Sequence, residues 1–324
     1  MTWRVRANDG IDPAGQKMLE DAGCIVETDH LEADDLFARI DQYDALLVRS
    51  ATKVRTDLIN KATRLKVIGR GGVGLDNIDV DYAQHKGVVV VNTPAASSAS
   101  VAELVFAHLF SMVRGLQITN RVMPERGSEE FKALKKKCSK GSELAGKTLG
   151  IIGAGRIGRE TARIAIGCGM NVQFHDPFLD EVNVVVRFHP DLKIEDQTIT
   201  IDTISKEALL KTSDFVSLHI PGGGETVIGH PQFELMKEGA GLVNCARGGV
   251  VDEESLVNAM NSGKIAYAGV DVFAKEPPVY TDILKLENVS LSPHIGAATA
   301  EAQQRVGEEL ADKVIAHLSK VGSN

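Results

Sequence analysis

The amino-acid sequence predicts an α/β protein with two lobes, each built around a parallel β-sheet. Two series of short apolar runs alternate with helical patterns, one over the first hundred residues and one from about residue 147 onward. A further helical pattern, over residues 299–319, is apolar along one face and can return to the first lobe. We therefore expect a smaller domain from residues 1–96 and 295–324, interrupted by a larger domain over residues 97–294.

The first lobe is marked by clear local signals. Its first helix starts at Asp12, a capping residue, has Pro13 in the first turn and stops at Gly23. Strands and helices alternate from there, which favours a parallel sheet. The apolar runs that predict the strands are Val5, residues 24–26, residues 45–48, residues 66–68 and residues 88–91.

Residues 97–146 separate the two series and differ from both. Residues 97–115 are apolar on nearly every face of a helix, so the helix must be covered on all sides by its own domain or by a second subunit. Residues 121–146 are polar and strongly basic, and we expect them to form an arm that links two regions. The basic residues in question are Lys132, Lys135, Lys136, Lys137 and Lys140.

The second series opens with a glycine-rich turn between a strand and a helix. The strand over residues 148–152 runs directly into "GAGRIG", and a helix follows to about Gly169. The next strand ends in Asp176, an acid about 20 residues beyond the first glycine, as dinucleotide sites require. The glycines of this turn, which would let a pyrophosphate approach the helix N-terminus, are Gly153, Gly155 and Gly158.

Asp176 decides which dinucleotide is expected. Its carboxylate would accept hydrogen bonds from the adenosine ribose hydroxyls and would repel the extra phosphate of NADP. The alternative, a tight turn without a ligand, leaves the strand, helix and acid in this order unexplained. The sequence therefore predicts an NAD site.

Composition excludes several other classes of function. The net charge of −8 argues against a surface that binds nucleic acid or membranes as a whole. The four cysteines form no C-x-x-C pair, and no run of 18 uncharged apolar residues is present. We expect a cytoplasmic enzyme with no metal site and no nucleic-acid or membrane partner.

Three ionisable residues follow predicted strands of the second series. Arg247 follows the strand over residues 242–244, Glu276 the one over 266–271, and His294 the one over 289–292. Ligands of open parallel sheets bind beyond the carboxyl ends of the strands. Singly, these residues have ordinary explanations, namely a solvated arginine, a loop charge and a core histidine. Beside a dinucleotide site they form a coherent set.

These side chains suit the oxidation of an alcohol that lies next to a carboxylate. A histidine ionises near neutrality, so His294 could take the hydroxyl proton, and Glu276 could stabilise the resulting imidazolium. The planar fork of Arg247 could hold the carboxylate through two parallel hydrogen bonds. Gly248 and Gly249 would leave room for the substrate.

The motifs "GAGRIG", "NCARGG", "DVF", "EPP" and "SPHIGAAT", in this order, resemble those of the D-isomer-specific 2-hydroxyacid dehydrogenases. Within that family, "LLVRSATKV", "VIGRGGVGLDNID" and "VVVVNTPAASSASVAEL" are similar to the phosphoglycerate dehydrogenase branch. The resemblance implies two Rossmann-like lobes, with a doubly wound parallel-sheet nucleotide-binding domain inserted into a smaller, flavodoxin-like substrate domain.

The same resemblance implies a set of site residues. Arg247, Glu276 and His294 would be catalytic. The helix after Ser97 and the basic arm would build a homodimer. Cofactor contacts would come from Gly153, Gly155, Arg156, Ile157, Gly158, Asp176, Pro221, Cys245, Asp271 and Gly296. Substrate contacts from the smaller lobe would come from Arg49, Ser50, Gly72 and Val73.

A phosphorylated substrate would need local positive charge in a protein of net charge −8. Arg49 is the first candidate and Arg70 the second. Lys137 or Lys140 of the arm could add a contribution by reaching the neighbouring subunit's substrate.

The implied reaction is the NAD-dependent oxidation of D-3-phosphoglycerate to 3-phosphohydroxypyruvate, the first step of phosphorylated serine biosynthesis. A glyoxylate or hydroxypyruvate reductase of the same family, or an NAD-sensing corepressor-like protein, are the alternatives. Few residues follow His294, so we expect a short form without a C-terminal domain for serine feedback.

Two segments depart from the family pattern. Residues 181–202 are longer than the usual connection, and we expect an extra hairpin there. The loop "HIPGGGET", which contains Pro221, has three glycines where the family generally has bulkier residues.

Overall fold

A computed structural model describes residues 2–322 and divides the chain into two compact units. Unit 1 comprises the residues up to Ser98 together with those from Ala297 onward, and unit 2 comprises Ala99–Gly296. The expected α/β class with parallel sheets is confirmed in both units.

Unit 1 contains a five-stranded parallel sheet in the order β2-β1-β3-β4-β5. This order is typical of flavodoxin-like doubly wound folds, as expected. The carboxyl ends of the central strands β3 and β4 carry the predicted substrate residues of this unit. The strands are β1 (Arg4–Ala7), β2 (Ile25–Glu27), β3 (Ala45–Val48), β4 (Val67–Arg70) and β5 (Val89–Asn92).

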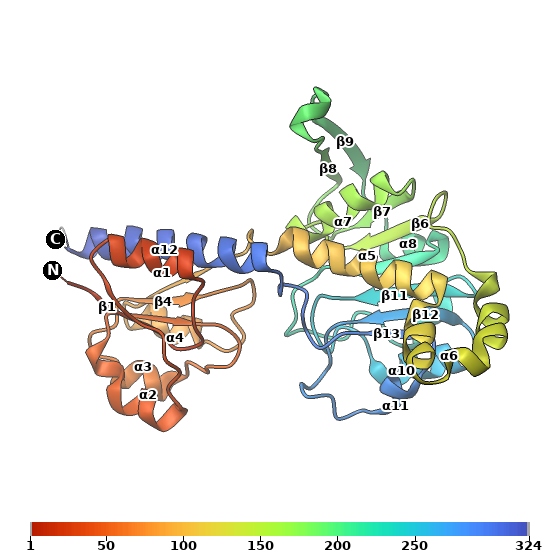
Figure 1. The fold of residues 1–324 in the computed structure, drawn as a ribbon. Coiled ribbons are helices and arrows are strands. Elements are labelled where there is room, and N and C mark those ends of the chain that lie inside the picture. The colour runs from red at the N-terminus through yellow and green to blue at the C-terminus, as the bar shows by residue number, and fades with distance from the viewer. Residues whose placement is uncertain (1, 323–324) are drawn as a thin grey trace. The chain divides into compact units, whose positions relative to one another are not determined.

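Helices cover both faces of the unit 1 sheet. On one face, α12 (Ala300–Gly322) lies beside α1 (Pro13–Asp21), as Figure 1 shows. The two helices approach closely at Gly15 and Gly307, because a Cβ at Gly15 would lie 2.4 Å from the Gly307 carbonyl oxygen. The other face packs against α2 (Ala33–Arg39), η1 (Ile40–Gln42), α3 (Thr56–Lys61) and α4 (Val80–His85).

Unit 2 contains a six-stranded parallel sheet in the order β13-β12-β11-β10-β6-β7. The direction of winding reverses between β6 and β10, and such a switch point is where open α/β sheets bind their ligands. The strands are β6 (Thr148–Ile152), β7 (Asn171–His175), β10 (Phe215–Leu218), β11 (Ala240–Asn244), β12 (Ile265–Val270) and β13 (Val289–Leu291).

Apolar side chains bury both faces of this second sheet. One core includes residues from α5 (Ser98–Arg114) and α7 (Arg156–Gly167). The opposite core includes residues from α8 (Lys206–Thr212), α9 (His230–Leu235), α10 (Glu253–Asn261) and α11 (Asp282–Lys285). Coverage on both faces confirms the doubly wound arrangement expected for the larger lobe.

The basic segment expected to form a linking arm is mostly helical. It lies in α6 (Leu116–Lys137) and the short η2 (Cys138–Lys140). The helix continues through Pro124, a residue that usually ends helices. Pro124 has no N–H to donate to the carbonyl of Asn120, but Asn120 is exposed, so water can bind this carbonyl instead.

Within residues 2–322 no single helix is long and apolar enough to span a membrane. Helices α5 and α6 with η2, which are bent by 67° relative to each other, reach that length and apolar composition only as a pair.

The longer connection forms the expected hairpin. Strands β8 (Glu181–Val186) and β9 (Gln197–Asp202) pair antiparallel, with η3 (Pro190–Leu192) at the tip. The hairpin projects beyond α7 in Figure 1. Val182 and Val184 on one face of β8 join the core beneath α7, which anchors its base.

Candidate active site

The glycine turn between β6 and α7 can accommodate a pyrophosphate. A Cβ at Gly153, where φ is +99°, would lie 2.4 Å from the His219 carbonyl oxygen, and one at Gly158 would lie 2.1 Å from the Gly153 carbonyl oxygen. Only glycine fits both positions. Gly155 precedes α7 and has no side chain to cap it, so the first N–H groups of this helix remain available to an anion.

Asp176 lies beside this turn at the end of β7. Its Oδ2 accepts a hydrogen bond from the Ala154 N–H at 2.9 Å, and its Oδ1 accepts one from the Phe178 N–H at 3.0 Å. Each carboxylate oxygen can accept more than one bond, so the ribose role predicted for Asp176 is compatible with both contacts. Arg156 is exposed and Ile157 half-buried at the start of α7.

Gly158→Ala should destabilise the protein and weaken NAD binding. The added methyl group meets a backbone oxygen that cannot move away alone, and such overpacking costs about 1–3 kcal/mol in the free energy of unfolding. Urea unfolding and NAD titration would measure both effects. Gly167→Ala is the matched control in the same helix, because nothing lies within 4 Å of its Cβ position. Equal stability of the two variants would contradict the steric argument.

The predicted catalytic residues follow three adjacent strands of the unit 2 sheet. Arg247 comes after β11, Glu276 after β12 and His294 after β13. Nδ1 of His294 lies 2.7 Å from Oε2 of Glu276, with the two side chains 48% and 40% exposed. A carboxylate that faces Nδ1 favours the proton on that atom, which leaves Nε2 as the acceptor.

Asp271 fixes the loop that carries His294. His294 has a positive φ of 56°, and its N–H donates to the Asp271 carbonyl oxygen at 2.7 Å. The Asp271 carboxylate, in a residue only 1% exposed, accepts the N–H groups of Ile295 and Gly296, both at 2.9 Å. Asp271 and Gly296 were predicted to contact the cofactor. In the structure the Gly296 N–H donates a hydrogen bond to the Asp271 carboxylate.

Asn244 holds the loop of Arg247 in a similar way. Its Oδ1 accepts from the Ala246 N–H at 3.1 Å, and its Nδ2 donates to the Arg247 carbonyl oxygen at 3.0 Å. The Arg247 side chain donates through Nη1 to the Ala246 carbonyl oxygen at 2.7 Å. Its aliphatic part packs on Gly222, where a Cβ would lie 2.8 Å from the Arg247 Cγ. Gly222, the first residue after the exposed Pro221, therefore makes room for Arg247.

Cys245 is a packing residue in this structure rather than a reactive thiol. Burial raises the pKa of the Cys245 thiol well above its ordinary value, and the charge of Asp271 raises it further. A neutral buried thiol is a poor nucleophile.

A largely apolar cavity of about 390 Å³ borders the His294–Glu276 pair. Both residues form part of its wall, so a group placed in this space would lie beside the predicted base. The apolar side chains that line it are Phe273, Pro277, Pro278, Leu284, Leu291 and Pro293.

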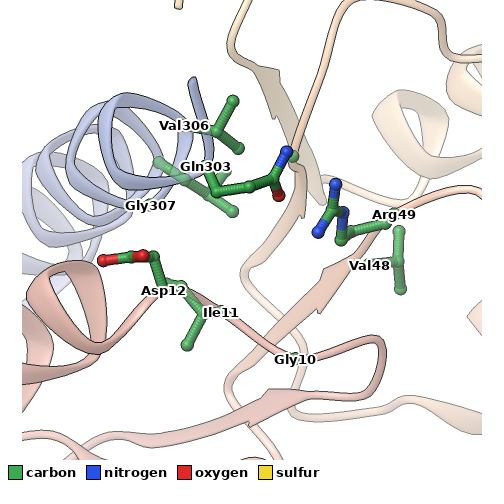
Figure 2. A pocket seen from close by; sticks show the side chains of 10 residues that line it. Gly10, Ile11, Asp12, Val48, Arg49, Gln303, Val306 and Gly307 are labelled. Atoms are coloured by element: carbon green, nitrogen blue, oxygen red, sulfur yellow. The ribbon is translucent and has the colours of Figure 1, made fainter. Parts of the chain in front are cut away.

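In unit 1, Arg49 and Ser50 follow β3 in a turn held by two side chains. Asp9 accepts the Arg49 N–H at 2.6 Å, and Asn77 donates to the Arg49 carbonyl oxygen at 2.8 Å. Arg49 lines a small cavity of about 20 Å³, across which it faces Gln303 of α12 (Figure 2). Gln303 is itself fixed by a 2.7 Å bond to the Ala297 carbonyl oxygen.

Arg70, Gly72 and Val73 occupy the end of the neighbouring strand β4. Gly72 has a φ of +136°, and the guanidinium of Arg70 lies against it, since a Cβ there would be 1.6 Å from Arg70 Nη1. The Gly72 N–H donates to Thr93 Oγ1 at 2.7 Å, and Asn92 donates to the Val73 carbonyl oxygen at 2.7 Å. Unit 1 thus brings the five substrate residues predicted there to one sheet edge.

The two remaining predicted substrate residues belong to unit 2. Lys137 ends α6 and pairs with Glu287 of the same chain, and Lys140 lies exposed in η2.

Sequence reasoning missed the residues that hold the site in place. Asp9 and Asn77 support the Arg49 turn, and Asn244 supports the Arg247 loop. Asp9 and Asn77 share no motif with Arg49, so the sequence carries no signal that pairs them with it, whereas Asn244 stands in "NCARGG" together with Arg247.

Comparisons with known proteins identify a matching family and similar chains. Residues 106–296 match the family described as "D-isomer specific 2-hydroxyacid dehydrogenase, NAD binding domain". The chain is 43% identical over 322 residues to a hydroxypyruvate reductase of Thermotoga maritima, covering 98% of both chains. It is 41% identical over 313 residues to a D-3-phosphoglycerate dehydrogenase of Methanocaldococcus jannaschii, covering 96% of this chain and 56% of that relative.

The chain thus spans little more than half the length of this phosphoglycerate dehydrogenase. Among solved structures, NAD⁺-bound 3-phosphoglycerate dehydrogenase of Entamoeba histolytica superposes with a TM-score of 0.77 at 25% identity, over 98% of this chain and 96% of that one.

Proposed function

Because this chain belongs to the D-isomer-specific 2-hydroxyacid dehydrogenases and its cofactor is NAD, we propose that it oxidises D-3-phosphoglycerate to 3-phosphohydroxypyruvate, the first step of phosphorylated serine biosynthesis. The observation that carries the choice of substrate is the pair of Arg49, which follows β3, and Arg70, which ends the adjacent strand β4. Two guanidinium groups at one sheet edge suit a doubly charged phosphate.

Each predicted residue has a defined task in this proposal. Arg247 binds the substrate carboxylate, and His294 accepts the hydroxyl proton at Nε2. Glu276, hydrogen-bonded to Nδ1, orients the ring and stabilises the imidazolium. The glycine turn after β6 holds the pyrophosphate and Asp176 the ribose of NAD. Bound NAD would supply the acceptor for the hydride that leaves the substrate carbon.

A second candidate is a hydroxypyruvate or glyoxylate reductase. The observation in its favour is the similarity to the Thermotoga maritima hydroxypyruvate reductase, which extends over 98% of both chains. This candidate would use the same three catalytic residues, but it would not require a phosphate site.

Comparing substrates decides between the two candidates. The kcat/KM for 3-phosphoglycerate with NAD would be measured beside those for hydroxypyruvate and glyoxylate with NADH. We expect the phosphorylated substrate, and 3-phosphohydroxypyruvate in the reverse direction, to be strongly preferred. A preference for hydroxypyruvate would replace the proposal with the second candidate.

Glu276→Gln should lower kcat for oxidation about 10- to 100-fold. The amide cannot stabilise the charge that His294 gains when it takes the hydroxyl proton, and a hydrogen bond to a charged group contributes about 1.5–3 kcal/mol. The measurement is kcat at saturating substrate, with Glu254→Gln of α10 as a control of the same charge change. An unchanged kcat would show that Glu276 does not assist His294.

We also propose that the chain forms a homodimer through α5 and α6. These helices expose large apolar side chains in the single chain, and such surface favours association. The exposed residues are Phe110, Leu116, Met123 and Phe131.

Replacing Lys137 and Lys140 together by alanine should cause a modest loss of kcat/KM for 3-phosphoglycerate that disappears at high salt. Both side chains would act through long-range attraction, which ions screen within about 10 Å at 0.1 M. Lys137 is already paired with Glu287, which limits its contribution. Activity assays across a salt series, with Lys285→Ala as control, would measure this. A loss that salt leaves unchanged would mean direct contact instead.

A further inference from the structure

A buried histidine lies behind the loop that carries His294. His108 of α5 is only 3% exposed, and both nitrogens of its ring face serine hydroxyls. Nδ1 lies 2.8 Å from Oγ of Ser290, and Nε2 lies 3.0 Å from Oγ of Ser292. Ser290 belongs to β13, and Ser292 follows this strand two residues before His294.

The direction of each hydrogen bond follows from Asp271. Both carboxylate oxygens of Asp271 face backbone N–H groups, so the carboxylate can only accept. The Ser292 hydroxyl, 2.6 Å from Asp271 Oδ1, therefore donates its single proton to it. Ser292 Oγ must then accept the remaining bond from the Nε2–H of His108.

Burial lowers the pKa of His108 more than the nearby charge of Asp271 raises it, so the ring is neutral. A neutral ring with its proton on Nε2 accepts at Nδ1, which matches a donating Ser290 hydroxyl. Both ring nitrogens of His108 and the Ser292 hydroxyl are thus hydrogen-bonded, and each of these hydrogen bonds has one possible direction.

The adjacent strand leaves space for this ring. Gly269 of β12 lies under His108, and a Cβ there would be 2.7 Å from the His108 Cβ. An alanine at this position would push the ring away from both serines. The glycine in the strand is therefore matched to the histidine in the helix.

We propose that His108, as a neutral ring protonated on Nε2, is a positioning residue for the catalytic loop. Through Ser292 it orients Asp271, which binds the N–H groups of Ile295 and Gly296 and the N–H of His294. His108 thereby keeps His294 in the backbone conformation from which Nδ1 meets Glu276. This inference rests on the proposed function only in its assignment of His294 as the base.

The first test measures which ring nitrogen of His108 carries the proton, and it does not depend on enzyme activity. Nitrogen NMR of the full chain, labelled at histidine and assigned by the signal lost in His108→Gln, should show His108 as the Nε2–H form throughout the neutral pH range. Ser292→Ala should leave a mixture of ring forms, because the acceptor of the Nε2–H bond is gone and Ser290 can either donate to Nδ1 or accept from it. A ring protonated on Nδ1, or one that titrates near neutrality, would overturn the proposal.

The second test measures turnover. His108→Leu should lower kcat about tenfold, as expected for the loss of a buried hydrogen bond, while KM for NAD changes little. His108→Gln, whose amide can donate to Ser292, should recover most of the rate. Leu109→Met, a volume-conserving change in the same helix, should behave as the wild type. Equal kcat in His108→Leu and the wild type, or no recovery by glutamine, would overturn the proposal.

The two proposals can fail separately. If the wild type oxidises no 2-hydroxy acid, the proposed function fails, and the His294 ring signals then decide the inference. We expect these signals to shift in His108→Leu but not in Leu109→Met. Unshifted His294 signals would show that His108 supports the fold alone.

Discussion

Replacing Arg247 by lysine should lower kcat/KM by about 100-fold or more, equivalent to about 2.7 kcal/mol of transition-state stabilisation. The positive charge is kept, but lysine cannot offer two parallel N–H groups to a carboxylate. The loop that presents Arg247 is held by Asn244 and leaves its aliphatic part packed on Gly222, so the guanidinium starts from a defined position. Lysine lacks both the fork and this placement.

Steady-state kinetics with the preferred 2-hydroxy acid would measure this loss. Arg163→Lys is a suitable control, because Arg163 pairs with Glu160 on α7, away from the predicted catalytic loops. Near-normal activity of Arg247→Lys would show that the carboxylate is bound elsewhere.

The order of strands and helices could be predicted because apolar runs and turn residues are local signals. Asp12 and Pro13 begin α1 as expected, and its end before Gly23 needs no tertiary information. Strand β4 was expected at residues 66–68 and is found at Val67–Arg70, since its last residues carry no apolar signal. The helical form of the basic segment was not predicted. Pro124 usually ends a helix, and because few residues of this helix are buried, its sequence lacks a regular apolar pattern.

The catalytic part of the candidate site could be predicted because its residues lie in the loops that follow strands. Arg247, Glu276 and His294 were found in this way, since the carboxyl ends of parallel strands meet at one edge. Asn244 lies only three positions from Arg247, but other partners that hold the site lie far away along the chain. His108 and Ser292 are separated by 184 positions, and a buried histidine in an apolar helix shows no sign of its role.

Arg49→Ala should raise KM for 3-phosphoglycerate about 10- to 100-fold, while a non-phosphorylated 2-hydroxy acid is affected much less. A hydrogen bond to a charged group contributes about 1.5–3 kcal/mol, and only the phosphorylated substrate would lose that interaction. The turn that presents Arg49 is held through its backbone by Asp9 and Asn77, so removal of the side chain should leave the turn intact.

The comparison of KM values for the two substrates, rather than either value alone, tests the phosphate site. Arg55→Ala is the control, because Arg55 lies in the same unit and pairs with Asp79. If Arg49→Ala weakens both substrates equally, Arg49 binds a group that they share, such as the carboxylate. The phosphate would then have to be bound elsewhere, and the hydroxypyruvate reductase would become the better assignment, because that reaction does not need a second cationic site.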